Sequence, residues 1–269
     1  MNEEQKKFYN TSDTYFKLLS EHPEESFKEY IDFVIHYARP GATVLDQGCG
    51  TGQAADALRR RGFKIIGIDG SERFIDYARQ RFPETDFQLG DLLQLPFSSG
   101  SFDVVASFNT LEHVSDVPKV LTESLRVLKL NGLLLIHSPN LLSAKHMYNA
   151  YRLKTGRTFE GNKSNWDLLR DALRNIAWLM RRTITHQAKF IYRQPAPVFE
   201  YADNDATVFL NPIDLRLTLE SLGAKIISYQ SVPHLPEASL LKRLGSRFFP
   251  EHMGIIRIVA KKSARYERH

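Results

Sequence analysis

Short apolar runs alternate with amphipathic helical stretches from Val44 to Leu135, and this alternation most constrains the fold. It is typical of a parallel sheet that carries helices on both faces. With 42% of its 269 residues hydrophobic, the chain can bury a core of that size. The sequence therefore predicts an α/β fold with a doubly wound sheet.

Seven strands and six helices are expected along the chain. The expected strands are 44–46, 64–69, 86–89, 102–107, 133–137, 225–229 and 254–260. The expected helices are 24–39, 53–61, 71–82, 118–129, one that begins at Asn211 and stops before Gly223, and a short one at 238–247. Asn211 suits a helix N-cap and Pro212 suits the first helical position, where the missing N–H costs nothing.

Three glycines alternate directly after the first apolar run, in Thr43–Gly52. Glycine allows positive φ and removes the side chain, so a ligand can approach the main chain at Gly48, Gly50 and Gly52. The helix expected from Gln53 directs its free N–H groups at the same space. The stretch predicts a nucleotide-cofactor loop.

The spacing favours one kind of cofactor. A dinucleotide loop has the pattern G-x-G-x-x-G, whereas this chain has G-x-G-x-G with Asp46 two residues ahead. A carboxylate there repels a pyrophosphate and suits an ammonium group. S-adenosylmethionine carries an ammonium, a sulfonium and no phosphate, so it is favoured, and a nicotinamide oxidoreductase is the weaker alternative.

Four motifs then follow in order, at Val44–Gly52, Ile65–Ser71, Gly90–Phe97 and Phe102–Val114. In these motifs the chain resembles the Rossmann-like (class I) S-adenosylmethionine-dependent methyltransferases, in their small-molecule and quinone-biosynthesis branch. The resemblance covers roughly residues 43–140, with a weaker match over 211–261. It implies a seven-stranded, mostly parallel sheet whose last strand is antiparallel, with a helical insert after the fifth strand.

The expected domain organisation follows the same pattern. Residues 1–42 form an N-terminal helical cap, 43–140 the cofactor-binding core, 141–210 an insert that covers the acceptor, 211–261 the completion of the sheet and 262–269 a tail. The resemblance also implies that Tyr9, Tyr15 and Phe16 lie near the acceptor.

The expected cofactor-binding residues are Asp46, Gly48, Gly50, Gly52, Asp69, Gly70, Asp91, Leu92 and Asn109. Asp69 ends the second strand, where doubly wound sheets place their ligands, and can accept from both ribose hydroxyls. Alternatively, Asp69 is only the acid before a Ser-capped helix.

The resemblance assigns Asp91 to the adenine amino group and Leu92 to main-chain and apolar contact, while a local turn is the alternative for Asp91. Asn109 is expected at the sulfonium and methionine end. Asp46 either orients the ammonium or orders the glycine loop. Cys49 is interpreted as a small turn residue and not as a nucleophile.

His113 is the candidate general base, because it follows the fourth strand beside the expected methyl group. A base assists transfer to a hydroxyl, so O-methylation is favoured. The equally weighted alternative is that His113 caps or braces the next helix, and His137 is a second, weaker candidate. Glu112 and Asp116 also follow the fourth strand, but Glu112 belongs to a motif of metal-free members, so no metal is expected.

The insert is locally basic. Residues 151–193 hold ten Lys or Arg against three acids, an excess larger than the net charge of +5 of the whole chain, and aromatic residues are interleaved with them. The favoured partner is a small anionic or aromatic acceptor. A membrane-surface or lipid-linked substrate, RNA and a merely solvated face are the alternatives, as is a non-catalytic subunit that binds a partner protein.

The single cysteine fits a reducing compartment, and the start of the chain lacks an apolar signal region. No apolar run approaches the roughly 20 residues that span a bilayer. A soluble, cytoplasmic protein is expected, and the sequence leaves the oligomeric state undetermined.

Overall fold

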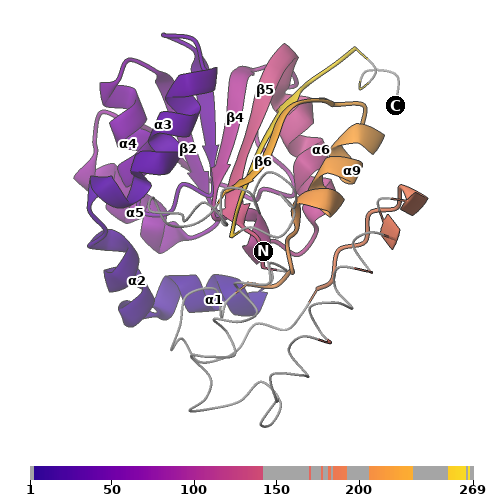
Figure 1. Ribbon diagram of the computed structural model, residues 1–269. Coiled ribbons are helices and arrows are strands. Elements are labelled where there is room, and N and C mark those ends of the chain that lie inside the picture. The colour runs from indigo at the N-terminus through magenta and orange to yellow at the C-terminus, as the bar shows by residue number, and fades with distance from the viewer. Residues whose placement is uncertain are drawn as a thin grey trace, which may run out of the picture.

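A seven-stranded sheet forms the centre of the computed structural model, which describes residues 3–141, 170, 177, 181–182, 184–192, 206–232, 254–264 and 266 (Figure 1). The strand order is β3-β2-β1-β4-β5-β7-β6. The strands are β1 (Thr43–Gln47), β2 (Lys64–Asp69), β3 (Asp86–Leu89), β4 (Phe102–Phe108), β5 (Leu128–Pro139), β6 (Lys225–Val232) and β7 (Ile255–Lys261). Strands β1 to β5 pair in parallel, and β7 runs antiparallel to both β5 and β6. The predicted mostly parallel sheet with an antiparallel last strand is confirmed.

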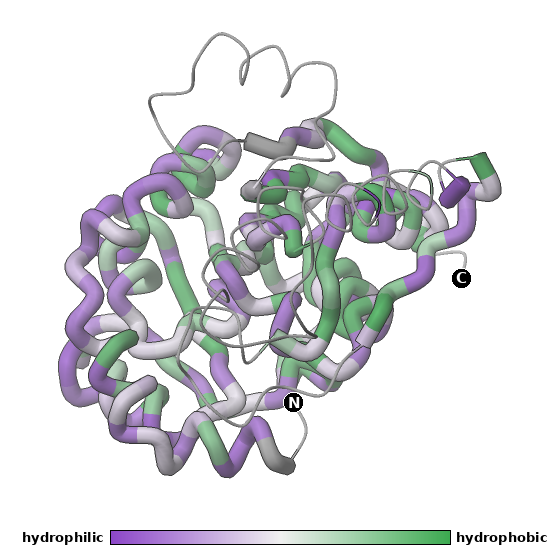
Figure 2. The backbone as a smooth tube through the Cα atoms, turned by 60° about the horizontal axis from the view of Figure 1, so that its bottom comes forward, coloured by the Kyte–Doolittle hydropathy of each residue, from purple (hydrophilic) through white to green (hydrophobic). Residues whose placement is uncertain are grey.

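Helices cover both faces of the sheet (Figure 1). One face carries α3 (Lys28–Tyr37), α4 (Gln53–Arg60) and α5 (Glu72–Arg81), and the other carries α6 (Val117–Val127) and α9 (Pro212–Ser221). Successive strand residues point to opposite faces, so Val44 and Val104 pack in one core and Leu45 and Val105 in the other. Strands covered on both faces need apolar side chains on both sides, as in Val104–Ala106 of β4 and Leu133–Ile136 of β5, and green stretches run through the centre of the fold (Figure 2).

The N-terminal region is more helical than expected. Instead of one helix over 24–39, the chain forms α1 (Glu3–Thr11), α2 (Asp13–Ser20), the short 3-10 helix η1 (Glu24–Phe27) and α3. Ser12 caps α2, since its hydroxyl accepts from the Tyr15 N–H at 3.3 Å. Helices α1 and α2 lie below the edge of the sheet at which the parallel strands end (Figure 1). Their position matters for the site described below.

One predicted helix start is confirmed in detail, and a second helix begins at a cap that the sequence analysis did not predict. Asn211 caps α9 by accepting from the Asp214 N–H at 2.9 Å, and Pro212 occupies the first turn. Asp116 caps α6 by accepting from the Lys119 N–H at 2.9 Å. Helix α6 ends at Val127, two residues earlier than expected, because Leu128 already pairs with β4 and starts a longer β5.

Leu141, Leu210 and Tyr192, which belong to the described part of the segment 141–210, contact the core. Leu141 donates its N–H to the Leu210 carbonyl at 3.1 Å, and Val117 donates its N–H to the Tyr192 hydroxyl at 3.0 Å. Most of the basic stretch 151–193, and all of the short helix expected at 238–247, lie outside the described residues. None of the helices built from described residues is long and apolar enough to span a bilayer.

Asp103 joins three segments at the opposite end of the sheet. Its Oδ2 accepts from the Thr43 N–H at 2.9 Å and from the Thr43 hydroxyl at 2.6 Å, and it lies 3.1 Å from Lys129 Nζ. Partial burial raises the pKa of Asp103, but the hydrogen bonds from Thr43 and Lys129 outweigh it and hold the pKa well below its usual value.

We expect Asp103→Asn to lower the free energy of unfolding by about 1–3 kcal/mol at pH 7, because the half-buried Thr43 donors lose a charged acceptor. A depressed carboxyl pKa stabilises the fold above the unfolded-state pKa of about 4, and that stabilisation is lost as the pH falls toward the folded-state pKa. Urea unfolding at pH 7 and pH 3 measures both values. Asp32→Asn, at an exposed pair with Lys28, is the matched control. A deficit that stays constant between the two pH values would contradict the assignment.

Candidate functional site

A cavity of about 440 Å³ opens where β1, β2 and β4 end, and α1 and α2 close it from below. This volume is within the range of roughly 300–1,000 Å³ that is usual for small-molecule sites. His113 and every expected cofactor-binding residue except Gly52 line it. The other lining residues include Tyr9, Thr14, Tyr15, Leu18, Leu19, His22, Phe27, Tyr30, Cys49, Thr51, Gln53, Phe74, Phe108, Thr110 and Val114. The structure therefore brings the residues of all four motifs to one place.

The three glycines of the loop do different things, although all have positive φ. A Cβ on Gly48 would lie 2.2 Å from the Thr110 side chain, and one on Gly52 would lie 2.7 Å from Phe87. A Cβ on Gly50 would meet nothing within 4 Å. The main chain is therefore open to a ligand at Gly50. Gly52 packs inside the protein, which differs from the cofactor contact that its spacing indicated.

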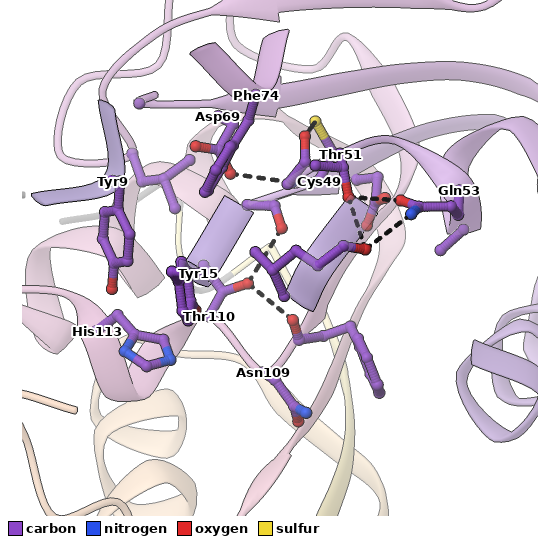
Figure 3. Close-up of a pocket in the computed structure, with 18 of the residues that line it drawn as sticks. Tyr9, Tyr15, Cys49, Thr51, Gln53, Asp69, Phe74, Asn109, Thr110 and His113 are labelled. Carbon is purple, nitrogen blue, oxygen red and sulfur yellow. Dashed lines mark hydrogen bonds between the residues drawn. The ribbon is translucent and has the colours of Figure 1, made fainter. Parts of the chain in front are cut away.

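Asp69 holds the loop in this conformation. Its Oδ2 accepts from the Gly50 N–H at 3.0 Å (Figure 3), and its Oδ1 accepts from the Ser71 N–H at 2.9 Å. Burial raises the pKa of Asp69, and the hydrogen bonds from the Ser71 and Gly50 N–H groups oppose that rise. Asp69 thus orders two turns from within the lining of the cavity, and its expected role toward a ribose stays a prediction.

Asp91 and Asn109 lie on two other edges of the cavity. Asp91 Oδ1 accepts from the Leu93 N–H at 3.0 Å, so one carboxylate oxygen makes the local turn that was the alternative hypothesis. Asn109 has φ of +47°, a conformation that few non-glycine residues adopt. Its N–H donates to the His137 carbonyl at 2.9 Å, which fixes this strained turn at the end of β4.

Asp46 is buried at the end of β1 and bonded to a partner that the sequence did not indicate. The Tyr30 hydroxyl donates to Asp46 Oδ1 at 2.5 Å, and the two residues are 0% and 2% exposed. Burial raises the pKa of Asp46 to about 6, with the Tyr30 hydrogen bond acting against the rise and the nearby Asp69 adding to it. Tyr30 lies on α3, 16 residues ahead of Asp46, and no local spacing links the two.

His113 ends the short 3-10 helix η2 (Leu111–His113) and lies beside Tyr9 on the cavity wall (Figure 3). The two rings are edge-on with their centroids 6.4 Å apart. His113 Nε2 is 3.8 Å from Oε1 of the fully buried Glu112. Because Asp116 caps α6, His113 does not have the capping role that was one alternative for it.

The N-terminal helices are attached to the starts of α4 and α5, the two helices that follow β1 and β2. Gln53 Nε2, at the start of α4, donates to the Leu19 carbonyl at 2.9 Å. Asn10 Oδ1 accepts from the Ser71 hydroxyl at 3.0 Å and from the Arg73 N–H at 3.1 Å. Tyr9 and Tyr15 line the cavity, as the resemblance implied for this segment, whereas Phe16 packs outside it against Arg73. The sequence of residues 10–20 shows no motif that predicts these hydrogen bonds.

His137 and Cys49 are not placed to act as a base or a nucleophile. His137 is buried, with its ring 5.0 Å from the Phe108 ring, and does not line the cavity. Burial raises the pKa of the Cys49 thiol well above its usual value, with Asp69 and Asp46 adding to the effect, as suits an unreactive turn residue. In the described part of the chain, no cluster of three or more His, Cys, Asp or Glu could hold a metal ion.

Comparison with known proteins agrees with this geometry. Residues 45–136 match the family described as "Methyltransferase domain". A probable S-adenosylmethionine-dependent methyltransferase of Mycolicibacterium smegmatis is 36% identical over 103 residues, which are 38% of this chain and 40% of that protein. A demethylmenaquinone methyltransferase of Beutenbergia cavernae is 32% identical over 146 residues, 51% of this chain and 60% of that protein. The chain thus matches about two fifths to three fifths of these relatives' length.

Solved structures share the fold over nearly the whole chain. The PH0226 protein of Pyrococcus horikoshii covers 95% of this chain and 98% of its own, with a TM-score of 0.60 and 17% identity. A SAM-dependent methyltransferase of Archaeoglobus fulgidus covers 93% and 99%, with a TM-score of 0.58 and 18% identity. Residues 45–136 are thus similar to the methyltransferase-domain family, whose matched relatives include S-adenosylmethionine-dependent enzymes, and the chain shares its fold with solved structures of such methyltransferases.

Proposed function

We propose that this chain binds S-adenosylmethionine in the cavity and moves its methyl group to an oxygen of a small-molecule acceptor. The observation that carries the proposal is the composition of one cavity, in which the open main chain of Gly50, three carboxylates and His113 meet. The described lining holds Asp46, Asp69 and Asp91 but no Lys or Arg. Such a lining suits a cationic ligand and disfavours a pyrophosphate.

The residues present fit the cofactor group by group. Asp46 would accept from its ammonium, Asp69 from the ribose hydroxyls and Asp91 from the adenine amino group. Gly50 leaves space for the ligand, and Leu92 supplies apolar surface. When bound, S-adenosylmethionine supplies an activated methyl group on a sulfonium.

His113 is the proposed general base. It lines the same cavity as Asn109 and Asp46, so it can reach an acceptor placed beside the cofactor. Its imidazole would take the proton from the acceptor hydroxyl as the oxygen attacks. Alignment of donor and acceptor by the cavity supplies much of the remaining acceleration, with effective molarities of about 10⁵ M or more in favourable cases.

The lining supports an aromatic, uncharged acceptor over an anionic one. Tyr9, Tyr15, Phe27 and Phe108 contribute ring surface, and the described lining lacks a Lys or Arg that would pair with an anion. The relatives differ in their acceptors, since this chain is similar both to a demethylmenaquinone methyltransferase and to a malonyl-[acyl-carrier protein] O-methyltransferase. The RNA, lipid-linked and partner-binding alternatives depend mainly on residues 151–193, most of which lie outside the described ranges.

We expect S-adenosylmethionine and S-adenosylhomocysteine to raise the melting temperature of the protein, because both fit the carboxylate-lined cavity. At a concentration of 100 times Kd, a ligand adds about 2.7 kcal/mol to the free energy of unfolding. NAD and NADP should add nothing, since the Asp46 carboxylate beside the glycine turn repels the pyrophosphate. A thermal-shift panel of the four compounds measures this, and stabilisation by the nicotinamides alone would overturn the cofactor assignment.

Gly50→Ala should abolish cofactor binding with only a small loss of stability, because its Cβ points into open space. Gly100→Ala is the matched control for backbone strain, since Gly100 has φ of +72° and equally open surroundings. Gly52→Ala should instead cost stability, about 2–4 kcal/mol, because its Cβ overlaps Phe87 and Ala78. Calorimetric titration with S-adenosylhomocysteine and thermal unfolding separate the two effects. Unchanged binding in Gly50→Ala would contradict the open-cavity argument.

His113→Gln should lower kcat by about 10²–10⁴ and leave the Kd for S-adenosylhomocysteine unchanged, since a base acts only in the transfer step. His36→Gln, an exposed histidine on α3, is the control. Transfer of labelled methyl to a panel of phenols and enols provides the assay. Equal activity of His113→Gln and the unmodified protein would remove His113 from the mechanism. Tight cofactor binding with no transfer to any panel member or lysate component would favour the non-catalytic alternative.

A further inference from the structure

We propose that Tyr30 is a positioning residue, whose hydroxyl fixes the Asp46 carboxylate for recognition of the amino-acid end of the cofactor. The inference rests on the proposed function, because it concerns how the same cavity selects its ligand. Asp46 Oδ1 accepts the hydrogen bond from the Tyr30 hydroxyl, whereas Asp46 Oδ2 makes no hydrogen bond to a residue in the described ranges. One carboxylate oxygen is thus fixed, and the other is left for the cavity that Asp46 lines.

The geometry around Tyr30 holds its ring in one place. Its side chain is fully buried in the core between α3 and the sheet. The Phe108 ring stacks on it with centroids 5.0 Å apart and planes 27° apart, and His137 meets it edge-on at 6.4 Å. A buried hydroxyl that is fixed in this way keeps a charge-assisted bond to a carboxylate, which is stronger than a bond between neutral groups.

The surroundings of Asp46 otherwise favour its neutral form. Asp69 from β2 and the Cys49 thiol from the glycine loop are close enough to interact with it electrostatically. Asp91, His22 and His113 face the same cavity from other elements, and no Lys or Arg of the described residues lines it. The Tyr30 hydroxyl is therefore the group that stabilises the anion before a ligand arrives.

This arrangement makes recognition depend on pH in a defined direction. An ammonium ligand needs the anionic form of Asp46, whose pKa is about 6. Affinity is therefore present above pH 6 and is lost as the pH falls through that value. Removing the Tyr30 hydroxyl raises the pKa of Asp46 further, so the loss of affinity begins at a higher pH.

A pair of ligands isolates the amino-acid end. S-adenosylhomocysteine carries the ammonium group, whereas 5′-methylthioadenosine has the same adenosine and thioether without it. Tyr30→Phe keeps the ring and its stacking and removes only the hydroxyl. Tyr37→Phe, the same change on the same helix but outside the cavity lining, is the matched control.

Calorimetric titrations between pH 5.5 and 8 give the test. In Tyr30→Phe we expect about a tenfold weaker Kd for S-adenosylhomocysteine at pH 7, as for loss of one hydrogen bond to a charged group, and an upward move of its pH midpoint. The Kd for 5′-methylthioadenosine should change less than twofold. In an Asp46→Asn background the Tyr30→Phe change should weaken S-adenosylhomocysteine no further, since the two residues act as one unit.

The other possible results would contradict either the role of Tyr30 or the proposed function. Equal weakening of both ligands, no weakening, or an unmoved pH midpoint would overturn the role of Tyr30, because a merely structural residue gives those outcomes. Additive effects of Tyr30→Phe and Asp46→Asn would overturn it as well. Failure of the unmodified protein to bind either ligand would instead refute the proposed function, so the two failures are distinguishable.

Discussion

Three neighbouring parallel strands end at one edge of the sheet, and this constraint places everything else in the site. In the register of β1 with its neighbours, Asp46 lies opposite Gly67 of β2 and Ala106 of β4. Asp69 and Asn109 therefore follow within a few residues of the same level, although they are far apart in the sequence. Phe87 and Cys49 fill the space that a side chain on Gly67 would need, and the site occupies the place where doubly wound sheets bind their ligands.

Placing carboxylates together at a buried edge has an electrostatic cost, which the main chain and one tyrosine offset. Asp69 receives N–H groups from two turns, and Asp46 receives the Tyr30 hydroxyl. These donors shape the loop and also favour the charged forms that a cationic ligand requires. The same contacts thus contribute to the fold and to the proposed binding, because the buried acids would otherwise tend to be neutral.

The N-terminal helices add one wall to the cavity at this edge. Helix α2 accepts a hydrogen bond from Gln53, the first residue of α4. Asn10 of α1 accepts hydrogen bonds from the start of α5. Both helix starts lie at the edge of the sheet where the cavity opens, so these hydrogen bonds hold the N-terminal helices against the cavity. Tyr9 and Tyr15 then give the wall its aromatic character beside His113.

Local features were determined by the sequence alone. Strands β2 and β3 lie where the apolar runs predicted them, and the Asn211 and Pro212 helix start and the positive φ of the loop glycines follow from single residues. Gly52, by contrast, packs on Phe87 from a different strand, Tyr30 reaches Asp46 from another helix, and α1 is attached by contacts across some 60 residues. Propensity, spacing and capping act over a few residues, so they can be predicted from the sequence. Contacts between distant segments arise only when the sheet brings those segments together, so only the tertiary structure decided them.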